Sequence, residues 1–224
     1  MEVIKFLTKI AFVFVLLSCT NTPEFETGEI RTFQLLEEAL EKRNSLKNFP
    51  DSRKLLSRKQ IDNFNMPILF VELKSGQNGT LTLYPGQGDG QTWLGADGAT
   101  ITLDQGVLKA SRGMGDDIMG GKSFMPNWQE IKKSASYQRN ISYLAGNNLL
   151  NNMNFMCHIT NVSKEKIIDV WGLSFTVDEY SESCSGPMGK IKNTYLVDKK
   201  GMVRKSSQFH SETVGQILIE RIDR

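Results

Sequence analysis

The sequence predicts an all-β protein, in which an antiparallel meander forms a β-barrel or half-barrel, with one amphipathic helix near the N-terminus. Beyond Pro67, short runs of alternating apolar and polar residues recur, and gaps rich in glycine or Asp-Gly separate them. Strands that return every roughly 8–12 residues between such turns are typical of antiparallel all-β folds. Before Pro67, apolar residues instead recur at helical spacing, which predicts the single helix.

The first residues resemble a lipoprotein signal peptide. Lys5 and Lys9 precede an uncharged apolar run over residues 10–17. This run is shorter than the roughly 20 residues that a membrane helix needs, and it suits the roughly 7–15-residue core of a secretory signal. It closes with LLSC at residues 16–19, which resembles the bacterial lipobox. The resemblance implies cleavage before Cys19 and acylation of its thiol and amine; an ordinary signal peptide with a chance cysteine is the alternative.

These features define the expected organisation of the chain. We expect a signal peptide over residues 1–18, a lipidated tether over residues 19–28 and a single β-barrel domain over residues 29–224. Thr20 stands where an aspartate would usually retain a lipoprotein in the inner membrane, so the sorting rule implies the outer membrane. Acyl chains give a durable anchor because each buried CH₂ contributes about 0.8 kcal/mol.

The charge balance gives no reason to expect a nucleic-acid partner. The chain has 27 basic and 25 acidic residues, with a formal net charge of +2. Removal of residues 1–18 takes away two lysines and one glutamate, so the mature chain stays close to neutral. The remaining charges are interspersed rather than gathered in blocks. We also expect no cofactor.

Besides the acylated Cys19, two cysteines remain in the mature chain, Cys157 and Cys184. In an oxidising periplasm such a pair is most simply a disulfide, which would add about 3 kcal/mol in the chain-entropy model. Two free thiols and a metal site are the alternatives. We expect no bound metal, because the only histidines are His158 and His210 and no Cys-x-x-Cys pair exists.

The predicted elements follow in order along the chain. An amphipathic helix spans residues 27–44, with an acidic polar face, and a second helical turn lies near residues 57–61. About eleven strands follow. They include segments 68–74, 80–84, 91–94, 100–103, 106–111, 135–144, 154–160 and 167–177, a hairpin centred on residues 198–201, and a final strand over residues 214–222.

The stretch GVLKASRGMGDDIMGG, residues 106–121, raises the question of a ligand loop. In a phosphate loop the glycines have a fixed spacing and the lysine opens a helix, whereas here the spacing differs and Pro126 would break a helix. The adjacent Asp116 and Asp117 could ligate calcium, yet no bidentate glutamate follows at a useful offset. We therefore expect a strand that ends in a tight corner.

Three segments carry a resemblance to a known family. They are LSRKQIDNFNMPILFVELKSG, TWLGADGATITLDQGVLKASRGMGDDIMG and NTYLVDKKGMVRKSSQ. In this order they resemble the YjbF/GfcB-type lipoproteins of the group 4 capsule polysaccharide family. The resemblance implies a barrel-like fold of the YmcC-like kind, outer-membrane attachment on the periplasmic face, and a role in production or export of an extracellular polysaccharide. It also implies periplasmic and outer-membrane β-barrel partners, and it supplies no catalytic residues.

The predicted function is therefore that of a non-catalytic assembly or accessory factor in polysaccharide export. The alternative is a periplasmic carrier that binds lipid or glycan in a half-barrel groove. Trp128 is a candidate for stacking on a sugar, because its Pro-Asn flank predicts a loop, although core packing also accounts for a tryptophan.

We expect no enzymatic activity. A serine triad needs a histidine base, and we expect both His158 and His210 to be surface or rim residues. Glycosidase chemistry needs only two carboxylates. The first candidates for that chemistry would be Asp116, Asp117, Asp178 and Glu179.

Overall fold

A computed structural model describes residues 51–64, 66–86, 90–124, 127–144 and 149–224 of the chain. All of these residues belong to one unit, Pro50–Arg224. Cys19, the tether over residues 19–28 and the helix predicted over residues 27–44 lie outside the described residues.

Two short helices open the described part of the chain, α3 (Ser52–Leu55) and α4 (Arg58–Asn63). A capping box starts α4: the Ser57 hydroxyl accepts from the Gln60 backbone N–H, and the Gln60 side chain accepts from the Ser57 N–H. The helical turn predicted near residues 57–61 is confirmed. No helix among the described residues is long and apolar enough to cross a membrane.

Twelve strands follow, joined in one antiparallel sheet within the described residues. A 3-10 turn, η2 (Trp128–Glu130), separates the sixth strand from the seventh. The strands are β1 (Ile68–Leu73), β2 (Asn78–Tyr84), β3 (Gln91–Gly95), β4 (Thr100–Asp104), β5 (Val107–Arg112), β6 (Ile118–Ser123), β7 (Ser134–Leu144), β8 (Leu150–Val170), β9 (Leu173–Gly186), β10 (Gly189–Asp198), β11 (Val203–Ser211) and β12 (Gly215–Arg221).

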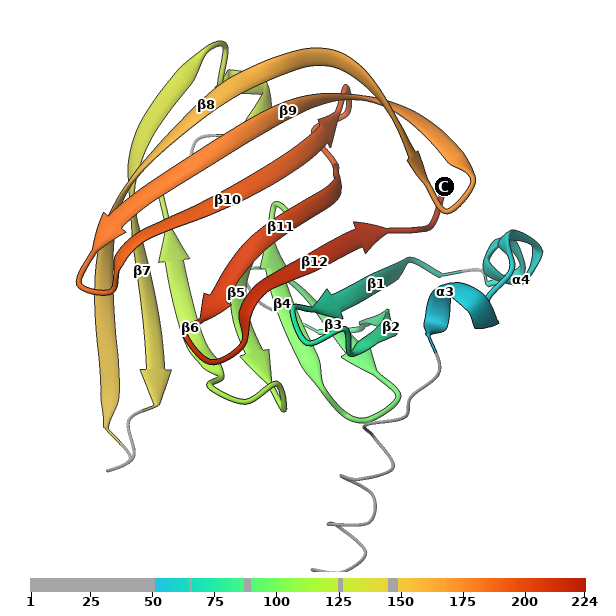
Figure 1. Cartoon of the computed structure of the whole chain (residues 1–224), viewed down its shortest axis with the longest axis horizontal. Helices are drawn as coiled ribbons and strands as arrows, with labels where there is room; N and C mark the ends of the chain where they lie inside the picture. Colours follow the sequence, from blue (N-terminus) through green and yellow to red (C-terminus); the bar gives the residue numbers. More distant parts are fainter. Residues whose placement is uncertain (1–50, 65, 87–89, 125–126, 145–148) are drawn as a thin grey trace, which may run out of the picture. The chain divides into compact units, whose positions relative to one another are not determined.

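The sheet curls into a nearly closed barrel (Figure 1). Its order is β5-β4-β3-β2-β1-β12-β11-β10-β9-β8-β7-β6, so the first and last strands pair and the edges are β5 and β6. These edges meet: a Cβ at Gly121 of β6 would lie 3.0 Å from the Lys109 carbonyl oxygen of β5. The Arg112 guanidinium also donates to the Ile118 carbonyl across the seam, at 2.9 Å. The predicted antiparallel β-barrel fold is confirmed.

The glycine-rich stretch is the corner at this seam, between β5 and β6. The Asp117 carboxylate accepts hydrogen bonds from the backbone N–H groups of Gly113 (2.7 Å) and Met114 (3.1 Å), and from the Ser111 hydroxyl (3.0 Å). One of the two acids considered as calcium ligands therefore holds the turn together. The prediction of a tight corner is confirmed.

The single strand predicted over residues 167–177 is wrong. A hairpin turn divides it, because β8 ends at Val170 and β9 begins at Leu173. Trp171 and Gly172 both have positive φ, 54° and 78°, as a two-residue hairpin turn of type I′ requires. Tryptophan is not a usual turn residue, and tertiary contacts hold it there: its ring lies 5.3 Å from that of Phe70, centroid to centroid.

The core has two parts. The larger cluster collects the inward-facing residues of nearly all strands, among them Trp93, Ile101 and Tyr195. The smaller one joins Ile61 of α4 and Phe70 of β1 to Val170 and the C-terminal Ile222. Because β1 contacts both clusters, four successive residues of it are buried rather than alternate ones.

Candidate functional site

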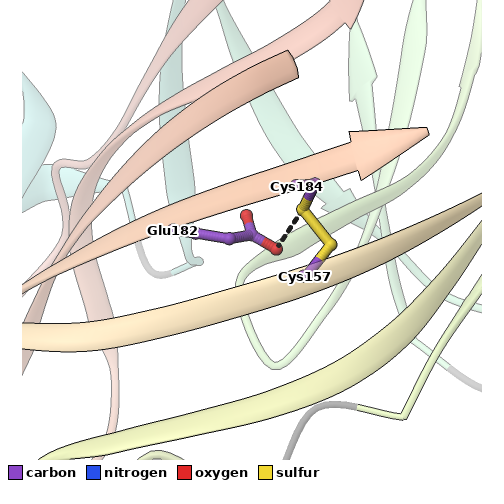
Figure 2. A group of neighbouring side chains, drawn as sticks. All are labelled: Cys157, Glu182 and Cys184. Atoms are coloured by element: carbon purple, nitrogen blue, oxygen red, sulfur yellow. Dashed lines mark hydrogen bonds between the residues drawn. A yellow bond between two sulfur atoms is a disulfide. The ribbon is translucent and has the colours of Figure 1, made fainter. Parts of the chain in front are cut away.

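A disulfide joins the two cysteines in the barrel wall. Cys157 of β8 and Cys184 of β9 are directly paired across the strands, and their sulfur atoms are bonded at 1.97 Å. The predicted disulfide is thus present, and both side chains are fully buried. The Glu182 carboxylate lies beside it, with Oε1 3.3 Å from the Cys184 sulfur (Figure 2).

The same three residues have the composition of a metal site. Ligand atoms of Cys157, Glu182 and Cys184 lie within 4.8 Å of one another. A cysteine binds a metal as its thiolate, however, and both sulfur atoms are used in the disulfide. The oxidised protein therefore offers only the carboxylate of this group to a cation.

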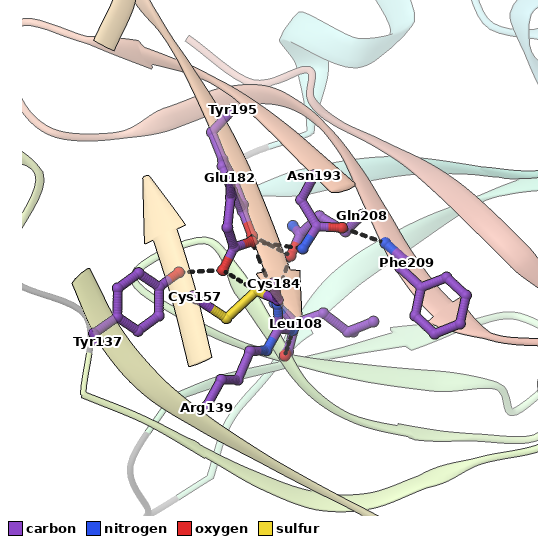
Figure 3. Close-up of a disulfide and its surroundings, with 10 residues drawn as sticks. All are labelled: Leu108, Tyr137, Arg139, Cys157, Glu182, Cys184, Asn193, Tyr195, Gln208 and Phe209. Atoms are coloured by element: carbon purple, nitrogen blue, oxygen red, sulfur yellow. Dashed lines mark hydrogen bonds and ion pairs between the residues drawn. A yellow bond between two sulfur atoms is a disulfide. The ribbon is translucent and has the colours of Figure 1, made fainter. Parts of the chain in front are cut away.

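Glu182 is the centre of a buried hydrogen-bond network (Figure 3). The Tyr137 hydroxyl donates to its Oε1, and Asn193 Nδ2 (2.5 Å) and the Tyr195 hydroxyl (2.8 Å) donate to its Oε2. The guanidinium Nη1 of Arg139, also buried, lies 3.6 Å from Oε2 and supplies the compensating charge. A buried carboxylate needs this many partners, because an unpaired charge in the interior is strongly unfavourable.

Burial and neighbouring charges shift the pKa values of Tyr195, Tyr137 and Arg139. Burial raises the pKa of Tyr195 well above its usual value, and the Glu182 charge raises it further. The same two causes raise the pKa of Tyr137. Burial is the largest influence on Arg139 and opposes its positive charge, but the neighbouring oxygens of Tyr195, Glu182, Tyr137 and Tyr143 together raise its pKa. The interior thus holds a charged Arg139 and neutral tyrosines.

Gln208 of β11 extends the network to β5. Its Oε1 accepts from the Leu108 backbone N–H at 2.8 Å, and its Nε2 donates to the Gly106 carbonyl at 2.8 Å. Arg139 Nη2 donates to the Leu108 carbonyl at 2.9 Å (Figure 3). Polar side chains from β7, β9, β10 and β11 therefore meet inside the barrel, where they also bind the backbone of β5.

His210 is buried, which corrects the expectation that it is a rim residue. β11 continues to Ser211, so His210 faces inward like Gln208 two residues before it. His158 lies exposed on β8, as expected, with its Nδ1 3.0 Å from the Ser136 hydroxyl.

The surroundings of His210 resemble a serine triad only in composition. Its Nε2 lies 2.8 Å from the Ser111 hydroxyl, and burial lowers its pKa. In a triad the acid binds the other ring nitrogen. Here Asp117 binds the Ser111 hydroxyl instead, and Nδ1 of His210 has no hydrogen-bond partner among the described residues.

Two grooves lie near the turn between β10 and β11, and Gly201 lines both. The first has a volume of about 550 Å³. Its lining combines apolar residues such as Leu69 and Trp93 with polar ones such as Lys200 and Arg221. The Trp93 side chain is only 1% exposed, and its Nε1 has no hydrogen-bond partner among the described residues.

The second groove has a volume of about 360 Å³ and includes Trp128, the candidate for sugar stacking. The Trp128 side chain is 2% exposed. Its ring centroid lies 5.2 Å from that of Tyr180 and 5.0 Å from that of Tyr195, and its Nε1 donates to the Gln105 carbonyl at 2.8 Å. These contacts are those of a core residue that also lines a groove; stacking on a sugar stays a prediction.

The acids considered for glycosidase chemistry are not gathered into one site. Asp117 holds the corner, and Glu179 forms an ion pair with Lys166 at 2.9 Å. Asp178 lines the second groove, and its Oδ1 accepts from the Glu165 backbone N–H at 2.9 Å.

The chain matches a known protein family. The model described as group 4 capsule polysaccharide lipoprotein gfcB, YjbF matches residues 33–222. The chain belongs to this family. The match includes all twelve strands, so the resemblance carried by three sequence segments is confirmed for the whole capsule lipoprotein domain.

A solved structure shares the fold of this capsule lipoprotein. The crystal structure of the hypothetical lipoprotein YmcC from Escherichia coli (K12) matches with a TM-score of 0.68 and 18% sequence identity. The match covers 77% of this chain and 93% of that chain. At this identity the likeness concerns the fold alone. A comparison with curated proteins finds no match.

The Glu182 network was not foreseen from the sequence of this capsule lipoprotein. One signal could have found it: Tyr180, Glu182 and Cys184 alternate along β9, so the glutamate shares a face with a buried cysteine. The partners of Glu182 come from two other strands, Tyr137 and Arg139 from β7 and Asn193 and Tyr195 from β10. Alternation within each strand places each pair on one face, but no spacing in the sequence links the two pairs to each other or to Glu182.

Proposed function

We propose that this protein is an outer-membrane lipoprotein on the periplasmic face that acts as a non-catalytic assembly or accessory factor in production or export of a capsular or extracellular polysaccharide. Membership of the group 4 capsule polysaccharide lipoprotein family is the observation that carries the proposal. The LLSC motif at residues 16–19 and Thr20 support the anchor and its outer-membrane destination.

Three features of the barrel support a non-catalytic role. Glu182 is saturated with donors in the interior. Asp117 binds Ser111 rather than His210, so the triad geometry is incomplete. Asp178 accepts hydrogen bonds from the backbone of β8 and from Asn161. Each group that could act as an acid or base among these residues has a structural partner instead.

The partners of such a factor would be proteins of the same export system. We expect a periplasmic protein and an outer-membrane β-barrel protein to bind the anchored domain. A pull-down of the protein from outer membranes, with identification of the captured proteins, tests this part of the proposal. Recovery of neither class of partner would contradict it.

The anchor is tested by variants at two adjacent positions. Cys19→Ala should abolish acylation, mislocalise the protein and reduce surface polysaccharide. Thr20→Asp should retain the protein in the inner membrane with a similar reduction. Thr20→Ser is the matched control and should behave as the wild type. Membrane fractionation and the amount of surface polysaccharide are the measurements; unchanged export in Cys19→Ala cells would contradict the proposal.

The first groove favours a second candidate function, that of a periplasmic carrier for a lipid or glycan. A volume of about 550 Å³ at a barrel end is large enough for a small ligand. Loss of a general lipid carrier should impair growth broadly, whereas loss of an export factor should reduce only the polysaccharide. Growth and polysaccharide measured in the same deletion strain distinguish the two functions.

A further inference from the structure

The second groove, lined by Trp128 and Tyr180, carries positive charge on its rim. Lys132 follows the 3-10 turn η2, Lys164 lies in β8, and Lys199 lies in the turn between β10 and β11; all three line the groove and are exposed. Lys199 pairs with Glu165 at 3.1 Å. Lys132 and Lys164 form no ion pair with any described residue.

The acids of this groove are occupied elsewhere. Asp198 Oδ2 accepts from the Arg204 guanidinium at 2.8 Å, and its Oδ1 accepts from the backbone N–H groups of Lys200 and Met202. Asp178 accepts from the Glu165 N–H and from the Asn161 side chain. The Arg204 guanidinium therefore compensates the charge of Asp198, whereas the donors to Asp178 are uncharged. The two unpaired lysines thus share the groove with one uncompensated carboxylate, and positive charge prevails.

A β-bulge places one of these lysines at the groove. The register of β8 with β9 shifts twice, between Asn161 and Ser163 and again between Ser163 and Lys166. Glu165 adopts a left-handed backbone conformation, with φ of 54°, which is uncommon for a residue other than glycine. The segment that carries Lys164 thus departs from the regular ladder at the groove, as bulges often do next to binding sites.

The wall of the groove offers uncharged hydrogen-bonding groups. Tyr180 lines the groove, and its hydroxyl has no hydrogen-bond partner among the described residues. The side chains of Gln129 and Thr176 also line the groove and form no hydrogen bond with another described side chain or backbone group. Hydroxyl and amide groups beside an aromatic wall suit the hydroxyls of a sugar.

We propose that this groove binds an acidic saccharide segment, with Lys132 and Lys164 at its carboxylate groups and Tyr180, Gln129 and Thr176 at its hydroxyls. A lipid tail does not suit a groove with charged lysines on its rim, and a neutral sugar would leave the lysines unused. The inference rests on the proposed function, to which it adds the chemical class of the ligand. Trp128 serves as part of the wall.

The test is calorimetric titration of the full chain, purified from membranes in detergent, with trigalacturonate as the acidic probe and maltotriose as the neutral one. We expect saturable binding of trigalacturonate that weakens as salt increases. Lys132→Gln/Lys164→Gln should weaken it roughly tenfold or more, the loss expected for charge-assisted hydrogen bonds. Tyr180→Phe should weaken it by a smaller factor.

Lys190→Gln/Lys192→Gln is the matched control, since both lysines are exposed near the other end of β10. This variant should bind as the wild type does. The proposal would be overturned if trigalacturonate did not bind, or if maltotriose bound equally well. It would also be overturned if the two double variants lost the same affinity for trigalacturonate, or if tripolyphosphate displaced trigalacturonate at equal concentration. The Cys19→Ala experiment does not depend on these results. A failure of the saccharide-binding proposal can therefore be distinguished from a failure of the proposed role in export.

Discussion

Glu182 and Arg139 form an ion pair in the middle of the barrel, where Oε2 of the glutamate lies 3.6 Å from Nη1 of the arginine and both side chains are buried. The pair is compensated by two tyrosine hydroxyls, an asparagine amide and the Leu108 carbonyl. Burial of two charges is unfavourable by itself, and removal of one partner leaves the other without compensation.

The first prediction concerns this pair. Glu182→Gln should lower the free energy of unfolding by about 3–5 kcal/mol, because Arg139 would remain buried and charged. Urea unfolding followed by tryptophan fluorescence measures the effect. Glu165→Gln is the matched control, since Glu165 is 71% exposed and its ion pair with Lys199 lies at the surface. A Glu182→Gln protein as stable as this control would contradict the assignment.

The disulfide should stabilise the barrel mainly through the unfolded chain. Cys157→Ala/Cys184→Ala should lower the free energy of unfolding by about 3 kcal/mol, because the bond closes a loop between residues 27 positions apart. Urea titrations with and without dithiothreitol are the measurement. Reductant should lower the stability of the wild type and leave the variant unchanged. Equal stability of variant and oxidised wild type would show that the bond contributes nothing.

His210 should make the protein less stable in acid. Its folded pKa is lowered by burial, although Asp117 and Asp116 raise it. The neutral ring therefore contributes fully to the free energy of unfolding above the unfolded pKa of about 6.5, and this contribution is lost as the pH falls through the folded pKa. His210→Gln should have a flatter dependence of unfolding free energy on pH below about 6.5. His158→Gln, which changes an exposed histidine, should keep the wild-type slope; equal slopes in all three proteins would refute the prediction.

Two glycines separate the effect of backbone conformation from that of crowding. Gly106 and Gly172 both have positive φ, 84° and 78°. A Cβ at Gly172 would meet nothing within 4 Å, whereas one at Gly106 would lie 2.4 Å from a methyl carbon of Val203. Gly172→Ala should cost about 1 kcal/mol from strain alone. Gly106→Ala should cost about 1–3 kcal/mol more from overpacking. Thermal unfolding of the two variants measures these losses of stability. An equal loss in both variants would contradict the crowding at Gly106.

Local patterns predicted those parts of the fold that depend on neighbours in the sequence. The glycine corner at residues 113–117 was predictable because its turn is closed by its own aspartate. The turn at Trp171-Gly172 was missed, since what holds the tryptophan comes from distant residues, Phe70 and Glu220. The burial of His210 was missed for a related reason: the extent of β11 depends on pairing with β10 and β12, which the local pattern does not contain.

The sequence by itself determined that the chain is a β meander, carries a lipobox-like start and has a pair of cysteines suited to a bond, because periodicity, turn chemistry and motif order are local properties. Only the tertiary structure decided which polar groups are inside the barrel and which lysines surround a groove. Strand pairing brings together residues that are far apart in the chain, such as Tyr137 with Glu182 and Lys132 with Lys164 and Lys199, and no spacing in the sequence encodes those distances.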